Sequence, residues 1–304
     1  MHIGLISDSD LVIPAVASFV SRQFSFSLYS APSKDPYINE KVRQFALQNR
    51  INITFGDEKG DKLYEWLKQG KYDIVFVISY SHIIEINRTG NSTELFNVHF
   101  GPLPAYQGPI PVFWQLKSGE EQLGMVIHKM TMEIDRGPVI WSKYIPNKNF
   151  HNFRSVMLLF SQLCVEGILY IIQIKSLHLP LAELERKQIV PSWQKKPELK
   201  DVIVNWKTMS SVEICNLIRA CNPWNKGAIT FLERQEIKII DANPVDEQSD
   251  LPAGSIIQDK ARLKVVCSDR NLLGINMLIY QDFYCSGENA NYYGIPNFRR
   301  FRDV

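Results

Sequence analysis

The chain has 304 residues, of which 45% are hydrophobic and 22% charged. This is the composition of a folded globular protein with a sizeable core and about two domains. The 34 lysines and arginines nearly balance the 32 aspartates and glutamates, so the sequence lacks the basic excess of a dedicated nucleic-acid-binding domain. A disordered or fibrous chain is excluded, and binding to RNA is unsupported.

The ends and apolar segments give no indication of membrane association. The first twenty residues lack a basic start and are interrupted by Asp8, Asp10 and Pro14, so we expect no signal peptide. Residues 156–174 approach the length of a bilayer span, but polar and charged side chains interrupt them and no interfacial anchors flank them. We predict that this segment is a buried helix.

The cysteines indicate a reducing compartment. Their number, five, is odd, they are scattered along the chain, and no CxxC spacing occurs. This pattern argues against a disulfide framework and against a zinc site. We therefore expect a cytoplasmic protein with no metal.

The first half of the chain has the pattern of a doubly wound α/β sheet. The apolar runs His2–Ser7 and Ile74–Ile78 predict strands that are buried on both faces of a parallel sheet. Charged amphipathic helices are expected between them, at residues 40–49 and 61–69. Three more strands and one long helix are expected afterwards, at residues 96–99, 124–130, 138–144 and 153–176.

The pattern changes after a polar segment rich in proline and lysine, PSWQKKPELK. We predict a catalytic domain at residues 1–190, a linker at 191–200 and a second domain at 201–304. The second domain is expected to begin with a short helix at residues 211–220. The brief runs AITFL, IKII, GSII and LKVV, separated by turn residues, then predict a small β-barrel.

The turn after the first strand argues against a dinucleotide cofactor. That fold requires GxGxxG at this turn, so that backbone amides can approach a pyrophosphate. Here the turn is SDSDLVIP, and its two aspartates repel phosphate. NAD-dependent chemistry is not expected.

Candidate chemistry lies in the segment that begins FNVHFGPLPAYQGPIP. Asn97 and His99 are two residues apart, so on a strand their side chains leave the same face. The amide can donate to a developing oxyanion, and the imidazole can take a proton from an attacking amine. The alternative is structural, because Asn and His at strand ends often bond to turn backbone.

Two further features narrow the choice. The glycines and prolines of GPLPAYQGPIP hold backbone carbonyls and amides in place, although they also suit any tight connection. Asp135 lies in MTMEIDRGPVI, where a loop returns to the sheet. Next to His99, its carboxylate is expected to hold the ring and favour the imidazolium form. By itself, an Asp near a Gly is more often a turn residue.

These motifs together resemble the family of formyltransferases that use 10-formyltetrahydrofolate. The resemblance implies that Asn97, His99 and Asp135 are the catalytic residues and that no metal is required. It extends past the linker, where VNWKTMSSVEICNLIRACNPWNKGAITF is similar to the start of that family's C-terminal domain. The implied fold is a Rossmann-like domain followed by a small open β-barrel of the oligonucleotide-binding type.

The resemblance also implies binding residues. DIVFVISYSHII is similar to the strand and loop that line the folate pocket, and the glycine- and proline-rich loop follows the catalytic pair. The acceptor is expected to contact Tyr106 and Gln107. The expected folate-binding residues are Tyr80, His82, Ile83, Ile84, Gly101, Pro102, Leu103 and Pro104.

The acceptor amine is the open part of the prediction. Methionyl-tRNA formyltransferases are expected to carry a basic insertion after the second strand, but residues 30–43 contain only three basic residues. A near-neutral surface gains little from counterion release on a polyanion. We therefore favour a small or carrier-tethered amine, such as an amino-sugar nucleotide, an amino acid or a peptide. Methionyl-tRNA is the alternative.

Two other functions use the same residues. One is a non-catalytic folate-binding or regulatory module that keeps the fold, which the presence of Asn97, His99 and Asp135 argues against. The other is hydrolysis of 10-formyltetrahydrofolate to formate. The enzymes dedicated to that reaction use a similar site. They also carry an N-terminal regulatory domain, which we do not expect here.

Overall fold

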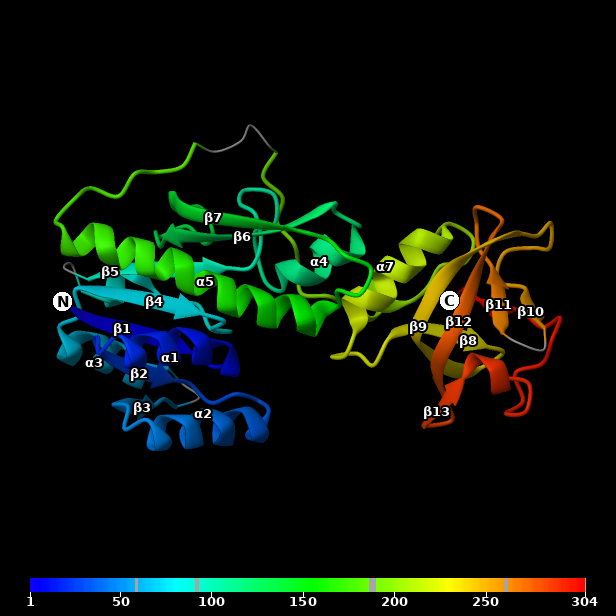
Figure 1. Ribbon diagram of the computed structural model, residues 1–304, viewed down its shortest axis with the longest axis horizontal. Coiled ribbons are helices and arrows are strands. Elements are labelled where there is room, and N and C mark those ends of the chain that lie inside the picture. Colours follow the sequence, from blue (N-terminus) through cyan, green and yellow to red (C-terminus); the bar gives the residue numbers. More distant parts are fainter. Residues whose placement is uncertain (58–59, 91–92, 186–189, 260–261, 304) are drawn as a thin grey trace. The chain divides into compact units, whose positions relative to one another are not determined.

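The computed structural model describes residues 1–57, 60–90, 93–185, 190–259 and 262–303 (Figure 1). It contains two compact units, and each is described by itself. Unit 1 comprises Met1–Pro111, Gly124–Ile145 and Met157–Lys195. Unit 2 comprises Val112–Leu123, Pro146–Val156 and Lys196–Val304. The predicted residue bounds of the catalytic domain, linker and second domain stay a prediction.

Unit 1 is built on a seven-stranded sheet with the order β3-β2-β1-β4-β5-β6-β7. Its strands are β1 His2–Ser7, β2 Ser25–Ser30, β3 Ile53–Phe55, β4 Ile74–Ile78, β5 Glu94–His99, β6 Gln122–Lys129 and β7 Val139–Pro146. The first five strands pair in parallel, and β6 runs antiparallel to β5. All five residues of β4 are buried, as expected for a central parallel strand that is covered on both faces.

Helices connect these strands. They are α1 Ile13–Ser21, α2 Pro36–Gln48, α3 Asp61–Gly70, α4 Pro111–Lys117 and α5 Phe153–Ser176. Among the described helices, α5 alone has the length and apolar content of a membrane span. It buries a stripe that includes Val156, Phe160, Cys164 and Ile168, which is the helical spacing of a core-facing side. The predicted helix is present, and one of its faces is buried.

Three elements near the N-terminus were not expected from the sequence: α1, β2 and β3. The helix expected at residues 40–49 begins earlier, at Pro36. Asp35 caps it by accepting from the amide of Tyr37 at 2.9 Å, and Pro36 occupies the first turn, where its missing N–H costs nothing.

Unit 2 contains a curled antiparallel sheet. Its elements are α6 Leu199–Val202, α7 Ser211–Cys221, β8 Ala228–Leu232, β9 Gln235–Gln248, β10 Ile256–Gln258, β11 Leu263–Val266, β12 Asn271–Tyr280, β13 Phe283–Ser286 and β14 Phe301–Arg302. The strand order is β10-β11-β12-β9-β8-β14, and β13 pairs with β12. The two ends of the sheet are tied where Ile256 N donates to Arg299 O at 2.8 Å and Phe301 N donates to Gly254 O at 2.9 Å. The sheet thereby curls into a barrel, and the predicted fold class is confirmed.

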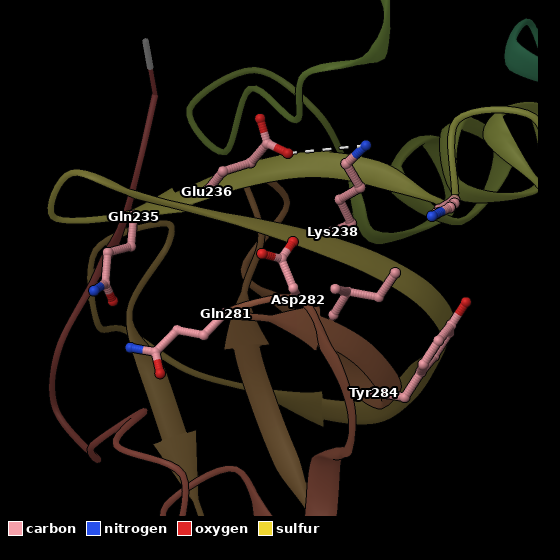
Figure 2. Close-up of a pocket in the computed structure, with 8 residues that line it drawn as sticks. Gln235, Glu236, Lys238, Gln281, Asp282 and Tyr284 are labelled. Atoms are coloured by element: carbon pink, nitrogen blue, oxygen red, sulfur yellow. Dashed lines mark ion pairs between the residues drawn. The ribbon is translucent and has the colours of Figure 1, made fainter.

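A polar hollow of about 400 Å³ opens on this barrel beside β9 and β12 (Figure 2). Cations and anions are mixed in its lining, and Lys238 Nζ lies 3.8 Å from Glu236 Oε1. Such a lining has no net preference for a charged ligand.

The packing of α5 generates a stability prediction. Replacing the buried Phe160 with Ala removes a ring that lies 5.6 Å from that of Phe100. We expect the free energy of unfolding to fall by about 3–5 kcal/mol because a cavity remains. The matched control on the same helix is Leu158→Ala, because Leu158 is exposed and should cost only about 0.5 kcal/mol. Equal losses in urea unfolding of the two variants would contradict a core-facing α5.

Candidate active site

The alternation of β5 places Asn97 and His99 on one face at the carboxyl end of the strand. Because parallel strands end at the same edge of a sheet, this is the edge where ligands bind in open α/β folds. β6 runs antiparallel beside β5, and its register places His128 opposite Asn97. Both histidines are buried.

Asp135 reaches this face from the loop between β6 and β7. Its backbone is left-handed, with φ of 54°, and Gly137 follows two residues later. A Cβ on Gly137 would lie 1.7 Å from the Lys129 carbonyl oxygen, so only glycine fits there. The carboxylate Oδ1 lies 3.7 Å from His99 Nδ1 and 3.4 Å from Asn97 Nδ2. The structure therefore brings the three predicted catalytic residues together.

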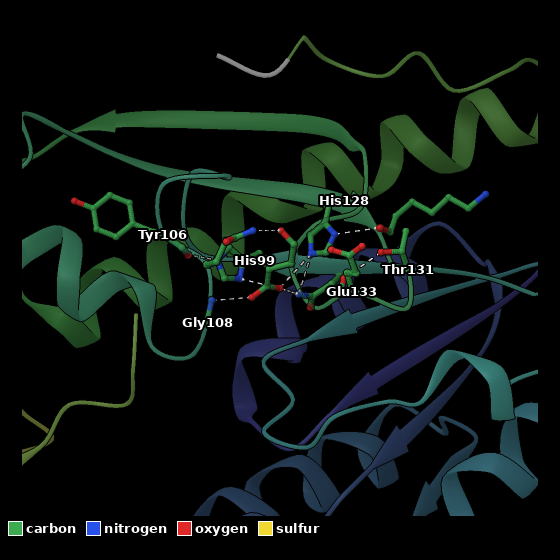
Figure 3. Close-up of polar contacts among 10 residues, drawn as sticks. His99, Tyr106, Gly108, His128, Thr131 and Glu133 are labelled. Carbon is green, nitrogen blue, oxygen red and sulfur yellow. Dashed lines mark hydrogen bonds and ion pairs between the residues drawn. The ribbon is translucent and has the colours of Figure 1, made fainter. Parts of the chain in front are cut away.

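The backbone carbonyl of Tyr106 determines which ring nitrogen of His99 carries the proton. His99 Nε2 lies 2.6 Å from the Tyr106 carbonyl oxygen, which can only accept a hydrogen bond. In the neutral ring, Nε2 therefore carries the proton, and Nδ1 is the basic nitrogen that faces Asp135. Figure 3 shows His99 beside this loop, with the Tyr106 ring directed away from it.

Burial determines the charge of His99. Desolvation lowers the pKa of His99 below 6.5, and nearby His128 lowers it further. Asp135 and the Tyr106 carbonyl raise the pKa but do not offset burial. Asp135 favours the imidazolium form, as expected, but desolvation is the larger effect and the pKa of His99 stays below its ordinary value.

Asp135, in contrast, stays ionised. Desolvation raises its pKa, but His128, His99 and the Gly108 amide together outweigh it and lower the pKa to about 2. The Gly108 amide donates to Oδ2 at 2.9 Å. A buried carboxylate that accepts a backbone hydrogen bond and lies beside two imidazole rings keeps its charge.

His128, which was assigned no role from the sequence, also lies in this cluster. Its Nδ1 lies 3.1 Å from the Lys129 carbonyl, and its Nε2 lies 3.2 Å from Asn97 Nδ2. Since a carbonyl only accepts, the neutral ring carries its proton on Nδ1 and accepts from Asn97 at Nε2. Figure 3 shows the two histidines turned toward each other. The only sequence signal was a histidine in the strand next to the catalytic pair.

The two predicted acceptor-binding side chains are buried. Tyr106 bonds to His99 through its carbonyl, and Gln107 Nε2 donates to the Asp135 carbonyl at 3.2 Å. Gly101 lies beneath them, where a Cβ would meet Pro111 Cβ at 2.6 Å and His99 Nε2 at 3.1 Å. Their acceptor contacts stay a prediction.

The predicted folate-binding residues fall into two groups. After β4, Ile84 and Tyr80 pack on the core, the Tyr80 and His82 rings lie 5.4 Å apart, and Ile83 is 70% exposed. After β5 come Gly101, Pro102, Leu103 and Pro104, of which Pro102 and Leu103 are partly exposed. Among the described residues, no group of three or more His, Cys, Asp or Glu side chains is placed to hold a metal ion.

Comparison with known proteins identifies the family. A model for formyl transferases matches residues 37–156, which include Asn97, His99 and Asp135. A model for the formyl transferase C-terminal domain matches residues 198–279. The chain belongs to the formyltransferase family. It is therefore an enzyme that transfers formyl groups.

Relatives of this formyltransferase have more than one acceptor. A methionyl-tRNA formyltransferase of Legionella pneumophila (strain Corby) is 24% identical over 294 residues, which cover 90% of this chain and 91% of that protein. Another, of Thermotoga maritima, is 30% identical over 195 residues, which cover 62% of this chain and 59% of that protein. Among solved structures, the sugar 3N-formyl transferase WlaRD matches with a TM-score of 0.70 and 19% identity, over 90% of this chain and 97% of that one.

The charge of Asp135 gives this formyltransferase a pH-dependent stability. A pKa lowered from 3.8 to about 2 in the folded state corresponds to about 2 kcal/mol of stability. Because the folded-state pKa is the lower one, this stability is present above about pH 4 and is lost as the pH falls toward 2. We expect Asp135→Asn to be less stable than wild type by up to about 2 kcal/mol at pH 7.

The difference in stability between the two proteins should narrow between about pH 4 and pH 2, as wild type loses the contribution of its charged carboxylate. Urea unfolding of both proteins across this range measures it. A difference that does not change with pH would show that the charge of Asp135 does not contribute to stability.

Proposed function

We propose that this formyltransferase transfers the formyl group of 10-formyltetrahydrofolate to the primary amine of a small or carrier-tethered acceptor. The observation that carries the proposal is the buried cluster at the end of β5. There the Asp135 carboxylate lies 3.7 Å from the His99 imidazole and 3.4 Å from the Asn97 amide. A cluster of this kind is unnecessary for a non-catalytic module, because it buries a charge at a cost to stability.

The surroundings of this cluster fit a folate. Three large apolar side chains are exposed on the loops that follow β4 and β6: Ile83 is 70% exposed, Met132 71% and Ile134 45%. Exposing apolar side chains to water is unfavourable. Apolar side chains beside a few polar groups are typical of pockets for flat heterocycles. Tyr80, His82, Ile83 and Ile84 would hold the donor from one side, and residues 101–104 from the other. The bound folate supplies an activated formyl group.

His99 is the base in this mechanism. Its Nε2 proton is held by the Tyr106 carbonyl, so Nδ1 accepts a proton from the attacking amine. The ring then becomes imidazolium, and Asp135, whose Oδ1 is 3.7 Å from Nδ1, stabilises the new charge. When the bond between the formyl carbon and the folate nitrogen breaks, His99 returns this proton to the leaving nitrogen, so that tetrahydrofolate is released and the ring is again neutral. The lowered pKa of His99 keeps the ring neutral, and therefore basic, at neutral pH.

Asn97 is placed to act on the formyl oxygen. One of its amide hydrogens is directed to His128 Nε2, and the other makes a longer contact of 3.4 Å with Asp135. We infer that the second hydrogen donates to the oxygen that gains charge when the amine adds to the carbonyl carbon. Such a donor contributes most in a buried site.

A small acceptor is supported by the near-balanced charge of the chain. Among structures that share the fold, WlaRD was solved with dTDP, and an N-formyltransferase of Helicobacter canadensis with dTDP-3-aminofucose. We infer an amino-sugar nucleotide, an amino acid or a peptide as the acceptor. The five cysteines, none of which is paired, support a cytoplasmic location.

Methionyl-tRNA is the second candidate, and a second hollow on the barrel favours it. This hollow has a volume of about 490 Å³, and its lining includes Lys207, Arg299, Arg300 and Arg302. Phe298, which also lines it, is 81% exposed. Cations beside an exposed ring suit a nucleic acid, but Glu233 and Asp303 pair with two of the cations.

Kinetics of site variants test the mechanism. His99→Ala should lower kcat on the order of a hundredfold to ten-thousandfold, since it removes the base. The control is His151→Ala, which removes another buried histidine with a lowered pKa. Near-normal turnover in His99→Ala would remove His99 from the mechanism.

The dependence of kcat on pH tests whether His99 reacts in its neutral form. Because only neutral His99 accepts a proton, kcat of wild type should fall on the acid side below pH 6.5. Asp135→Asn should lower kcat and retain folate binding. It should also move this acid limb to lower pH, because the charge that raises the pKa of His99 is gone.

The acceptor is tested by mass spectrometry. Enzyme and 10-formyltetrahydrofolate are offered methionyl-tRNA in one arm, and amino-sugar nucleotides and amino acids in the other, with His99→Ala as the control for uncatalysed transfer. We expect formylation of a small amine. Formylation of methionyl-tRNA alone would overturn this assignment, and release of formate without any acceptor would indicate hydrolysis.

A further inference from the structure

The loop that holds the catalytic groups is itself held by a distant segment. Residues 104–108 supply the Tyr106 carbonyl to His99 and the Gly108 amide to Asp135. Residues 192–194, at the start of the segment predicted as a linker, lie alongside this loop and belong to the same unit. Gln107 and Trp193 form an isolated parallel bridge there.

Three backbone hydrogen bonds join the two segments. Ser192 N donates to Pro104 O at 3.1 Å, and Gln107 N donates to Ser192 O at 3.0 Å. Gln194 N donates to Gln107 O at 2.8 Å. These bonds start and end on residues that flank Tyr106, so they limit how far the Tyr106 carbonyl can move.

The two segments lie so close together at Gly108 that no side chain fits at this position. Gly108 has φ of +94°, and a Cβ there would lie 2.3 Å from the Gln194 carbonyl oxygen and 3.3 Å from Trp193 Cε2. The loop backbone therefore runs between residues 192–194 on one side and Asp135 on the other. Side-chain burial contributes little to this contact, since Ser192 and Gln194 are partly exposed and Trp193 is 53% exposed.

We propose that residues 192–194 are a positioning strap, which holds residues 104–108 where the Tyr106 carbonyl selects the Nε2-protonated form of His99. The strap touches neither of the reacting groups. It acts through the loop, because the 2.6 Å contact between Tyr106 O and His99 Nε2 depends on where the loop backbone lies. Misplacement by about 1 Å can cost about a hundredfold in rate.

Substitution by proline tests the strap because it removes a backbone donor. Gln194→Pro removes the bond to Gln107 O, and Ser192→Pro removes the bond to Pro104 O. The matched controls are Gln194→Ala and Ser192→Ala, which change the same side chains and keep the N–H groups. Both positions lie outside the groups assigned to chemistry.

The first measurement is ¹⁵N NMR of the histidine rings in the full chain at about pH 8, with the His99 signals assigned by their loss in His99→Ala. We expect a single Nε2-protonated form in wild type and in the alanine variants. In the proline variants we expect shifts that average both neutral forms. Unchanged His99 shifts in folded proline variants would overturn the proposal.

The second measurement is kinetic, and it rests on the proposed function. We expect kcat to fall by at least about tenfold in the proline variants, with tetrahydrofolate affinity within about twofold of wild type and normal rates in the alanine variants. Equal loss in the alanine variants would assign the effect to side chains and contradict the strap. If wild type itself transfers no formyl group, the proposed function fails, whereas the NMR comparison still tests the strap.

Hydrogen exchange in wild type keeps the proposal testable if the proline variants do not fold. The amides of Ser192, Gln194 and Gln107 each donate to a backbone carbonyl, so they should be protected. Exchange at the rates of an unfolded chain would show that the strap does not form.

Discussion

The active site depends on the backbone of residues 104–108. A carbonyl can only accept and an amide can only donate, so this one peptide segment places a proton on His99 Nε2 and, together with His128 and His99, keeps a charge on Asp135. No side chain of the segment contributes to either bond. The conformation of the backbone therefore matters more here than the identity of the side chains, and Gly108 must adopt φ of +94°.

Burial determines how these hydrogen bonds affect the pKa of His99 and the charge of Asp135. In water, a carboxylate 3.7 Å from an imidazole mainly favours the protonated ring, and the histidine is then a weak base. In this site, desolvation lowers the pKa of His99 while hydrogen bonds keep Asp135 ionised. The carboxylate therefore matters most after the ring has taken a proton, because the attraction between opposite charges is strong where water is excluded. A resting neutral base and a stabilised protonated state are compatible for this reason.

The sequence predicts the parts of the fold and site that depend on local pattern. β1 and β4 are continuous apolar runs, and the shared face of Asn97 and His99 follows from strand alternation. β2, SFSLYS, has serines among its apolar residues and was missed; Ser27 is buried and is satisfied by Asn52 and His2 from elsewhere in the chain. His128 also escaped prediction, because its place opposite Asn97 depends on the register between β5 and β6. The spacing of residues in the sequence does not show how the two strands are aligned.

The same reasoning explains why the site does not identify the acceptor. In the proposed mechanism, Asn97, His99 and Asp135 act on the formyl carbon and the attacking nitrogen, which do not differ between acceptors. The loop beside them offers few side chains for selection, since the Tyr106 ring is buried and Gln107 bonds to the Asp135 carbonyl. We therefore expect groups outside this cluster to contribute most of the selection between acceptors. Relatives that formylate a tRNA or a sugar can then share one fold and one reaction.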